Sequence, residues 1–78
     1  MSINDWIKSE RKRRCMSVRE FGKFCGISYQ ILYDYENYRS IPSITTLIKI
    51  CNATNNDIYS VLNFTTYLSI INKSRKIK

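Results

Sequence analysis

Apolar residues recur along most of the chain at intervals of three and four residues, the spacing that places them on one face of an α-helix. The pattern predicts five short helices, at about residues 3–14, 17–25 and 29–37, from residue 44 onward, and from residue 55 or 56 onward. Chain breakers are scarce, since the only glycines and proline are Gly22, Gly26 and Pro42. The sequence therefore predicts an all-α fold with short connections.

Serine residues mark the expected starts of three helices, because a serine side chain can accept a hydrogen bond from the first helical turn. Ser17 lies three residues before Glu20, which is the spacing of a capping box, and Ser28 and Ser43 precede the third and fourth helices. The residues expected to face the core are Ile3, Trp6, Ile7, Phe21, Phe24, Cys25, Leu32, Tyr35, Glu36, Ile44, Leu47, Ile48, Cys51, Ile58, Val61 and Leu62.

The length of 78 residues allows one domain with one small core. Thirteen Lys and Arg against six Asp and Glu give a formal net charge of +7 at pH 7. A small basic domain favours a polyanionic partner, with nucleic acid first and an anionic membrane surface second. The basic residues at 73–78 are interpreted as an electrostatic supplement, so no membrane partner is expected.

Composition excludes several classes of protein. The sequence has no histidine, which removes histidine-based catalysis and histidine-ligated metals. Cys15, Cys25 and Cys51 form no CxxC pair, so no zinc site is expected, and such sparse thiols suit small core residues in a reducing cytoplasm. The sequence also has no paired carboxylates, Ser–Lys dyad or phosphate-binding glycine loop. We therefore expect no enzymatic activity, no cofactor and no small-molecule substrate.

Two predicted helices on either side of a tight turn, residues 17–25 and 28–37 around Gly26 and Ile27, form a helix-turn-helix pattern. The segment from Cys15 to Leu62 resembles, without an internal gap, the phage-repressor and Cro-like (XRE-type) helix-turn-helix family. The resemblance covers most of the chain, from Ile3 onward. It implies a compact five-helix, lambda-repressor-like DNA-binding domain at residues 1–63 and a short C-terminal extension at residues 64–78.

Particular positions carry this resemblance. Gly22 stands where the family has Ala, a small residue beside the crossing helix, and Gly26 takes a turn position that needs a left-handed backbone. Leu32 is the aliphatic anchor of the recognition helix. Arg11 and Glu36 match a family pair that resembles an inter-helix salt bridge, and an acid on an otherwise apolar stripe favours that interpretation over a solvated Arg11.

The chain departs from the family pattern at three places. Val18 stands where many members have a Gln that contacts phosphate and braces the recognition helix, so this brace is expected to be absent. Tyr38 replaces the family's Gly after the recognition helix, and Asn37 is expected to take the left-handed cap instead. Thr54 and Asn56 stand where the family prefers Leu and Val, which predicts a thinner core at that end.

The resemblance implies that residues near the start of the third helix read base edges in the major groove. The expected base contacts are Tyr29, Gln30, Tyr33 and Asp34. Gln30 can form two hydrogen bonds with adenine, and Asp34 can accept one from cytosine. For Tyr33, DNA contact and half-buried packing are equally favoured, and Ile31 faces either DNA or the edge of the core.

Helix N-termini and nearby donors are expected to meet phosphates. The expected phosphate contacts are Ser17, Arg19, Lys23, Ser28, Arg39, Ser40 and Ser43. Arg39 ranks first because it directly follows the recognition helix. Lys12, Arg13 and Arg14 strengthen the positive field, although a run of charge is more often a solvated face.

The predicted function is a sequence-specific double-stranded DNA-binding transcriptional regulator from a bacterium, phage or mobile element. It is expected to act as a repressor that occupies its operator as a homodimer. The alternative is an antitoxin or protein-binding adaptor on the same fold. Dimerisation is assigned to the region of the fourth and fifth helices or to the apolar run at residues 64–71. That run includes Phe64, Tyr67, Leu68, Ile70 and Ile71, and it can equally form a sixth helical stripe over the chain's own core.

Overall fold

The computed structural model describes residues 1–65 and residue 67 of the chain. Five helices follow one another in this part: α1 (Ile3–Arg13), α2 (Val18–Cys25), α3 (Tyr29–Glu36), α4 (Ile44–Ala53) and α5 (Ile58–Phe64). No strand occurs among the described residues. The predicted all-α fold is confirmed, and the order of the helices is the one that the apolar periodicity predicts.

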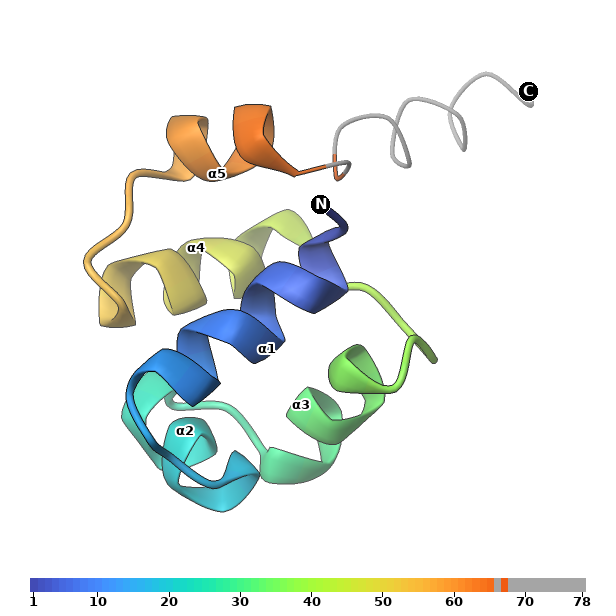
Figure 1. Ribbon diagram of the computed structural model, residues 1–78, viewed down its shortest axis with the longest axis vertical. Helices are drawn as coiled ribbons and strands as arrows, with labels where there is room; N and C mark the ends of the chain where they lie inside the picture. Colours follow the sequence, from blue (N-terminus) through green and yellow to red (C-terminus); the bar gives the residue numbers. More distant parts are fainter. Residues whose placement is uncertain (66, 68–78) are drawn as a thin grey trace.

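The helices are arranged around α1. Figure 1 shows α2 and α3 together at one end of the molecule and α4 and α5 toward the other, with α1 running between them. α3 packs against both α2 and α1, whereas α4 packs against α2 and α5. One side of α3 is therefore covered by its neighbours while the other side remains at the surface.

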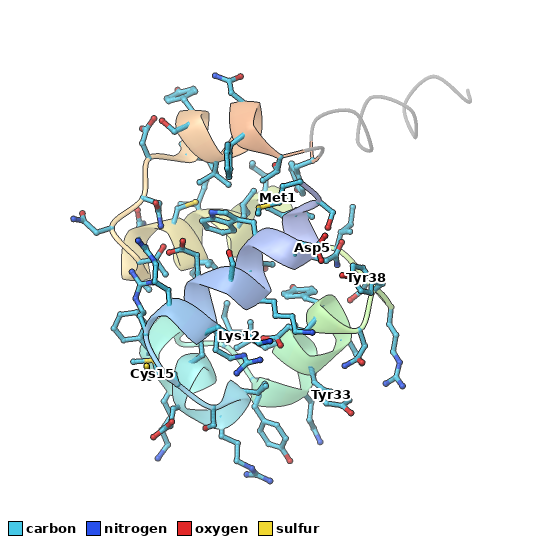
Figure 2. All side chains as sticks on the ribbon, viewed as in Figure 1. Met1, Asp5, Lys12, Cys15, Tyr33 and Tyr38 are labelled. Carbon is cyan, nitrogen blue, oxygen red and sulfur yellow. The ribbon has the colours of Figure 1, made fainter. Side chains whose placement is uncertain are left out.

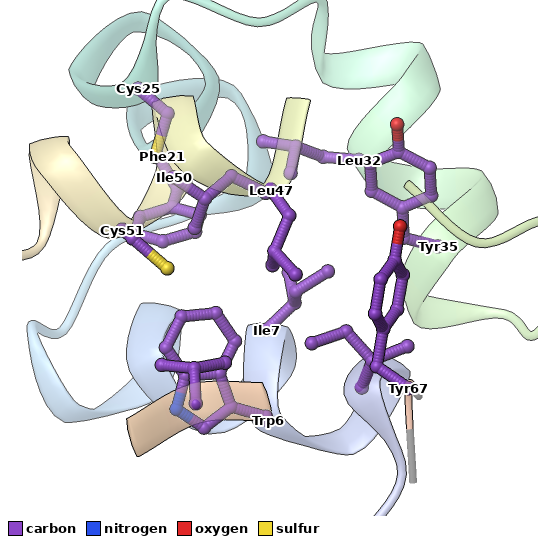
Figure 3. Packing of buried hydrophobic residues seen from close by; sticks show 12 residues of the cluster. Trp6, Ile7, Phe21, Cys25, Leu32, Tyr35, Leu47, Ile50, Cys51 and Tyr67 are labelled. Atoms are coloured by element: carbon purple, nitrogen blue, oxygen red, sulfur yellow. The ribbon is translucent and has the colours of Figure 1, made fainter. Parts of the chain in front are cut away.

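A single hydrophobic core joins all five helices, and burial of each large apolar side chain contributes about 1.5–3 kcal/mol. Phe21 of α2, Leu32 of α3 and Leu47 of α4 are completely buried. Figure 3 shows the cluster, which consists of Ile3, Trp6, Ile7, Phe21, Cys25, Leu32, Tyr35, Leu47, Ile50, Cys51, Val61 and Tyr67.

Three predicted core positions are wrong. Phe24, Ile44 and Ile48 are 43%, 47% and 42% exposed, whereas Ile50, which was not expected in the core, is fully buried. Apolar residues occur on several sides of α4, so periodicity alone does not select its buried stripe. Packing against α2 and α5 selects the side that carries Leu47 and Ile50.

The helix caps agree closely with the sequence. Ser17 and Glu20 form the expected capping box, and the side chains of Ser28 and Ser43 accept hydrogen bonds from the first turns of α3 and α4. α1 and α3 each end one residue earlier than expected. α5 begins later than predicted, at Ile58, because the side chain of Asp57 caps it.

Left-handed backbone follows three helices at residues other than glycine. Cys15, Tyr38 and Asn55 have φ values of 55°, 60° and 57°. The expectation that Asn37 takes the left-handed cap after α3 is wrong, since Asn37 has φ −100° and its side chain donates to the Tyr33 carbonyl at 2.8 Å. Tyr38 takes that conformation itself, and its hydroxyl donates to the carboxylate of Asp5. Figure 2 shows this contact between the start of α1 and the loop after α3.

Only two of the three thiols behave as core residues. Cys25 and Cys51 are buried, and burial raises the pKa of each thiol to about 11, which keeps it protonated. Cys15 is exposed, contrary to expectation, because it lies in the left-handed turn that ends α1.

Polar side chains close the end of the core where Thr54 and Asn56 depart from the family pattern. The Asn56 amide donates to Glu10 Oε1 at 3.0 Å and to Thr54 Oγ1 at 2.8 Å. Arg13 and Arg14 each donate to Glu10 Oε1 at 2.9 Å. Within the described residues, no buried side-chain nitrogen or oxygen lacks a hydrogen-bond partner. The thinner apolar core at this end is therefore closed by a satisfied polar network.

The approach of α3 to α2 is set by Gly22. A Cβ atom at this position would lie 2.7 Å from the carbonyl oxygen of Ile27 and 3.3 Å from the backbone nitrogen of Tyr29. Both neighbours are backbone atoms, which cannot turn aside as a side chain can. Gly26, with φ 72°, ends α2 in the left-handed conformation that the sequence predicts.

The Glu10 network should make the fold sensitive to acid. Burial alone raises the pKa of Glu10, but hydrogen bonds from Arg14, Asn56 and Arg13 outweigh it and hold the pKa below its ordinary value. A carboxyl with a lowered folded pKa contributes stability that is present above its unfolded pKa, about 4.3, and lost as pH falls through the folded value. Between pH 6 and pH 3, the melting temperature of Glu10→Gln should therefore fall by less than that of wild type. Equal losses in both proteins would contradict this assignment.

Gly22→Ala should destabilise the protein by about 1–3 kcal/mol, as overpacking does, although alanine is the better helix former. The expected cause is the close contact of the new Cβ with the Ile27 carbonyl. Urea unfolding followed by the fluorescence of Trp6, the single tryptophan, measures the change. Gly26→Asn is the matched control, because a Cβ at Gly26 meets nothing within 4 Å and asparagine tolerates a left-handed backbone. A Gly22→Ala variant as stable as wild type would show that α3 can move away from α2 at little cost.

Candidate nucleic-acid interface

A partly buried ion pair fixes the C-terminal end of α3. Arg11 of α1 donates from Nε to Glu36 Oε2 at 2.7 Å and from Nη2 to Glu36 Oε1 at 2.9 Å. Its remaining Nη1 donates to the carbonyl of Met16 at 2.9 Å. The hydrogen bond with Glu36 raises the pKa of Arg11 above its already high ordinary value. One guanidinium therefore holds α1, the loop before α2 and the last residue of α3 in register.

The inward residues of α3 determine which face is left at the surface. Leu32 and Tyr35 are buried, as the sequence predicts. Tyr29 is 37% exposed, Ile31 is 45% exposed and Tyr33 is 51% exposed. Tyr33 and Ile31 are thus both accessible from outside the molecule. Figure 2 shows the Tyr33 side chain pointing from α3 away from the body of the molecule.

An arginine lies beside each of the two exposed tyrosines of α3. The guanidinium carbon of Arg19, in α2, is 4.0 Å from the centre of the Tyr29 ring, and Arg19 Nη2 donates to the Tyr29 hydroxyl at 3.0 Å. Arg39, in the loop after α3, lies 5.8 Å from the Tyr33 ring centre and donates to Asp34 Oδ1 at 3.4 Å. Both arginines are phosphate contacts predicted from the sequence, whereas their pairing with the tyrosines was not predicted.

A shallow groove separates α2 from α3 and gathers several of the predicted contact residues. Arg19, Lys23, Ser28 and Tyr29 all line this groove. Gln30 follows on the exposed side of α3, one residue beyond the groove. The side-chain oxygens of Ser17 and Ser28 already accept hydrogen bonds as helix caps, so their hydroxyl hydrogens are the groups that can meet an anion.

The remaining predicted phosphate contacts, Arg39, Ser40 and Ser43, are exposed residues of the segment between α3 and α4. They do not line the groove between α2 and α3. Together with Arg19, Arg39 gives α3 a positive side chain on the segment before it and another on the segment after it.

Sequence reasoning missed the residue that anchors this segment. Asn4, buried in α1, donates from Nδ2 to the carbonyls of Tyr35 at 2.7 Å and Ser40 at 2.9 Å. The Tyr67 hydroxyl donates to the Pro42 carbonyl at 2.9 Å. A single polar residue on an apolar helical stripe was the only available signal for Asn4. The conformation of the loop that carries Arg39 is therefore held from α1 and from residue 67.

The structure describes only part of the predicted C-terminal run. Tyr67 is 2% exposed and packs in the chain's own core, whereas Phe64 is 63% exposed at the end of α5. Leu68, Ile70, Ile71 and the basic residues at 73–78 lie outside the described residues, and so does most of the predicted sixth helical stripe.

Two further findings concern other classes of site. No helix in the described part of the chain is both long and apolar enough to cross a membrane. Among residues 1–65 and 67, no three His, Cys, Asp or Glu side chains lie close enough together to hold a metal ion.

Comparison with known proteins identifies the motif. Residues 7–59 match the family model described as helix-turn-helix, HTH_3. The crystal structure of an HTH_3 family transcriptional regulator from Vibrio cholerae is similar, with a TM-score of 0.70 and 27% sequence identity. The similarity covers 85% of this chain but only 37% of the Vibrio cholerae chain. No curated protein sequence matches this chain.

Glu36→Gln should destabilise the protein by about 3 kcal/mol, because it leaves the partly buried Arg11 guanidinium without its counter-charge. Urea unfolding at neutral pH measures the loss. Asp34→Asn is the matched control: it breaks the exposed pair with Arg39 and should change stability by less than about 1 kcal/mol. Equal effects of the two substitutions would contradict the structural role assigned to Arg11 and Glu36.

Proposed function

This chain belongs to the HTH_3 helix-turn-helix family, and from that membership we propose that it is a sequence-specific double-stranded DNA-binding transcriptional regulator. The observation that carries the proposal is the exposed face of α3, which has Arg19 on one side and Arg39 on the other. A net charge of +7 supports the same partner, because duplex DNA is a dense polyanion.

In the proposed complex, α3 lies in the major groove and its first two turns face the bases. Gln30 forms two hydrogen bonds with the N6 and N7 edge of adenine, a contact that contributes about 1–3 kcal/mol of discrimination. Tyr29 and Tyr33 donate to bases or pack on thymine methyl groups. Asp34 accepts from cytosine N4 in exchange for its long hydrogen bond with Arg39.

Phosphate contacts orient the domain on the duplex without reading sequence. The proposed contacts are the exposed residues Ser17, Arg19, Lys23, Ser28, Arg39, Ser40 and Ser43. Each phosphate neutralised by a cation releases counterions, so binding should weaken steeply as salt rises.

We propose that the regulator is a repressor that binds its operator as a homodimer and thereby excludes polymerase. One α3 covers about half of such a site, and two copies place their α3 helices one DNA turn, ~34 Å, apart. The exposed apolar side chains of Ile44, Ile48 and Phe64 on α4 and α5 supply surface for self-association. Residues 1–63 form the DNA-binding domain in this proposal, and residues 64–78 form its extension.

The second candidate function is that of an antitoxin or protein-binding adaptor. The observation in its favour is the 45% exposure of Ile31, an apolar side chain of α3 that a protein partner could cover. The arginine beside each α3 tyrosine favours DNA, because an adaptor does not need cations around Gln30.

Selection from random duplex DNA at moderate salt tests the proposal. Wild type should retain an inverted repeat, and Gln30→Ala should lose the preference for one base pair in each half-site, at a cost of about 1–3 kcal/mol. Arg39→Ala should weaken binding to all sequences and reduce the salt slope by about 1 for each half-site. Tyr59→Phe, which removes only an exposed hydroxyl on α5, is the control and should bind as wild type does.

Weak retention without any motif would reject sequence-specific regulation and favour the protein-binding candidate. Recovery of single half-sites by a monomer in sedimentation would reject the homodimer while keeping the assignment of α3.

A further inference from the structure

α2 and α3 are joined at a second place besides the turn at Gly26. Arg19 lies in the first turn of α2, and Tyr29 is the first residue of α3. The Arg19 guanidinium carbon is 4.0 Å from the centre of the Tyr29 ring. The same guanidinium donates from Nη2 to the Tyr29 hydroxyl at 3.0 Å. Both the face and the polar end of the ring are therefore held by one side chain.

Arginine is the side chain best suited to make both contacts at once. Its planar guanidinium stacks on an aromatic face and carries five N–H donors, whereas a lysine ammonium is a point charge on a flexible stem. Val18, the preceding residue, is half-buried and packs against the core, so it offers no polar group to α3. The position that braces the recognition helix in many family members is thus apolar here, and the contact with the start of α3 comes from its neighbour Arg19.

The contact also sets the hydrogen-bonding character of Tyr29. The hydroxyl oxygen accepts from a cation, which uses a lone pair and leaves the O–H hydrogen to be donated. A major-groove edge that offers an acceptor, such as a purine N7 or thymine O4, satisfies this donor, whereas cytosine N4 presents another donor. An ordered Tyr29 therefore favours an acceptor and disfavours cytosine at the base it faces.

The corresponding pair on the other side of the exposed face is looser. Arg39 lies 5.8 Å from the Tyr33 ring centre, and its hydrogen bond goes to Asp34 instead of the tyrosine hydroxyl. Arg39 therefore holds its tyrosine less closely than Arg19 does.

We propose that Arg19 is a positioning residue that fixes Tyr29 as a specificity-determining side chain at the start of α3. The inference rests on the proposed function, because it names how one part of the DNA-reading face is set. This role of Arg19 goes beyond a phosphate contact, because Arg19 also affects sequence preference through Tyr29.

The first experiment uses the free protein. Aromatic ¹³C relaxation should show a less ordered Tyr29 ring in Arg19→Ala and in Arg19→Lys than in wild type. The Tyr59 ring, which is 72% exposed on α5, is the internal control and should be the same in all three proteins. Unchanged order at Tyr29 in both variants would overturn the proposal.

The second experiment is a double-mutant cycle measured on two duplexes. One is the duplex selected by wild type, and the other is the same duplex with cytosine at the base that Tyr29 faces. Arg19→Lys and Tyr29→Phe should each lower the preference between the two duplexes, and Arg19→Lys should do so by about threefold for a contact of cation–π strength. The double variant should lose no more preference than Tyr29→Phe alone, because Arg19 affects the preference only through the Tyr29 hydroxyl that it positions. If the preference lost by the double variant equals the product of the losses in the two single variants, the proposal is overturned and Arg19 is an independent contact. If wild type selects no motif, the proposed function fails, and the relaxation experiment still decides whether Arg19 positions Tyr29.

Discussion

The guanidinium of Arg11 is the contact on which the placement of α3 depends. It donates hydrogen bonds to both carboxylate oxygens of Glu36 and to the carbonyl of Met16. Taking an ion pair out of water is costly, and this geometry offsets the cost because each of the three guanidinium nitrogens donates to an acceptor at 2.7–2.9 Å. The pair holds the last turn of α3, while the bare backbone of Gly22 holds α2 against its start. The exposed face of α3 is thus supported at both ends by interactions on its hidden side.

A single small apolar core supplies little net stability. Polar side chains complete the structure at two places where the core is thin. Glu10 collects hydrogen bonds from Asn56 and two arginines below α5, and Asn4 satisfies two carbonyls of the segment after α3. These contacts also hold turns in which non-glycine residues such as Tyr38 adopt a left-handed backbone, at a cost of about 1–3 kcal/mol.

The candidate DNA interface likewise combines side chains from several segments. α3 is only eight residues long, and Leu32, Tyr35 and Glu36 are committed to packing. Its exposed positions are therefore few, and side chains from outside the helix complete the surface. Arg19 comes from α2 and Arg39 from the following loop, so the interface depends on segments whose relative positions are fixed by the core.

The sequence by itself determined the helices, most of their caps and the helix-turn-helix. It also pointed to Arg11 and Glu36 as partners through the family resemblance. These features follow from residues within a turn of one another or from a recognisable pattern. Only the tertiary structure decided that α4 buries Ile50 instead of Ile44 and Ile48, because apolar residues on several sides of a helix leave that choice to its neighbours. It alone decided that Tyr38 is left-handed, that Asn4 anchors the loop and that Arg19 meets Tyr29. Each of these depends on which side chains from separate segments meet, and local spacing carries no information on that.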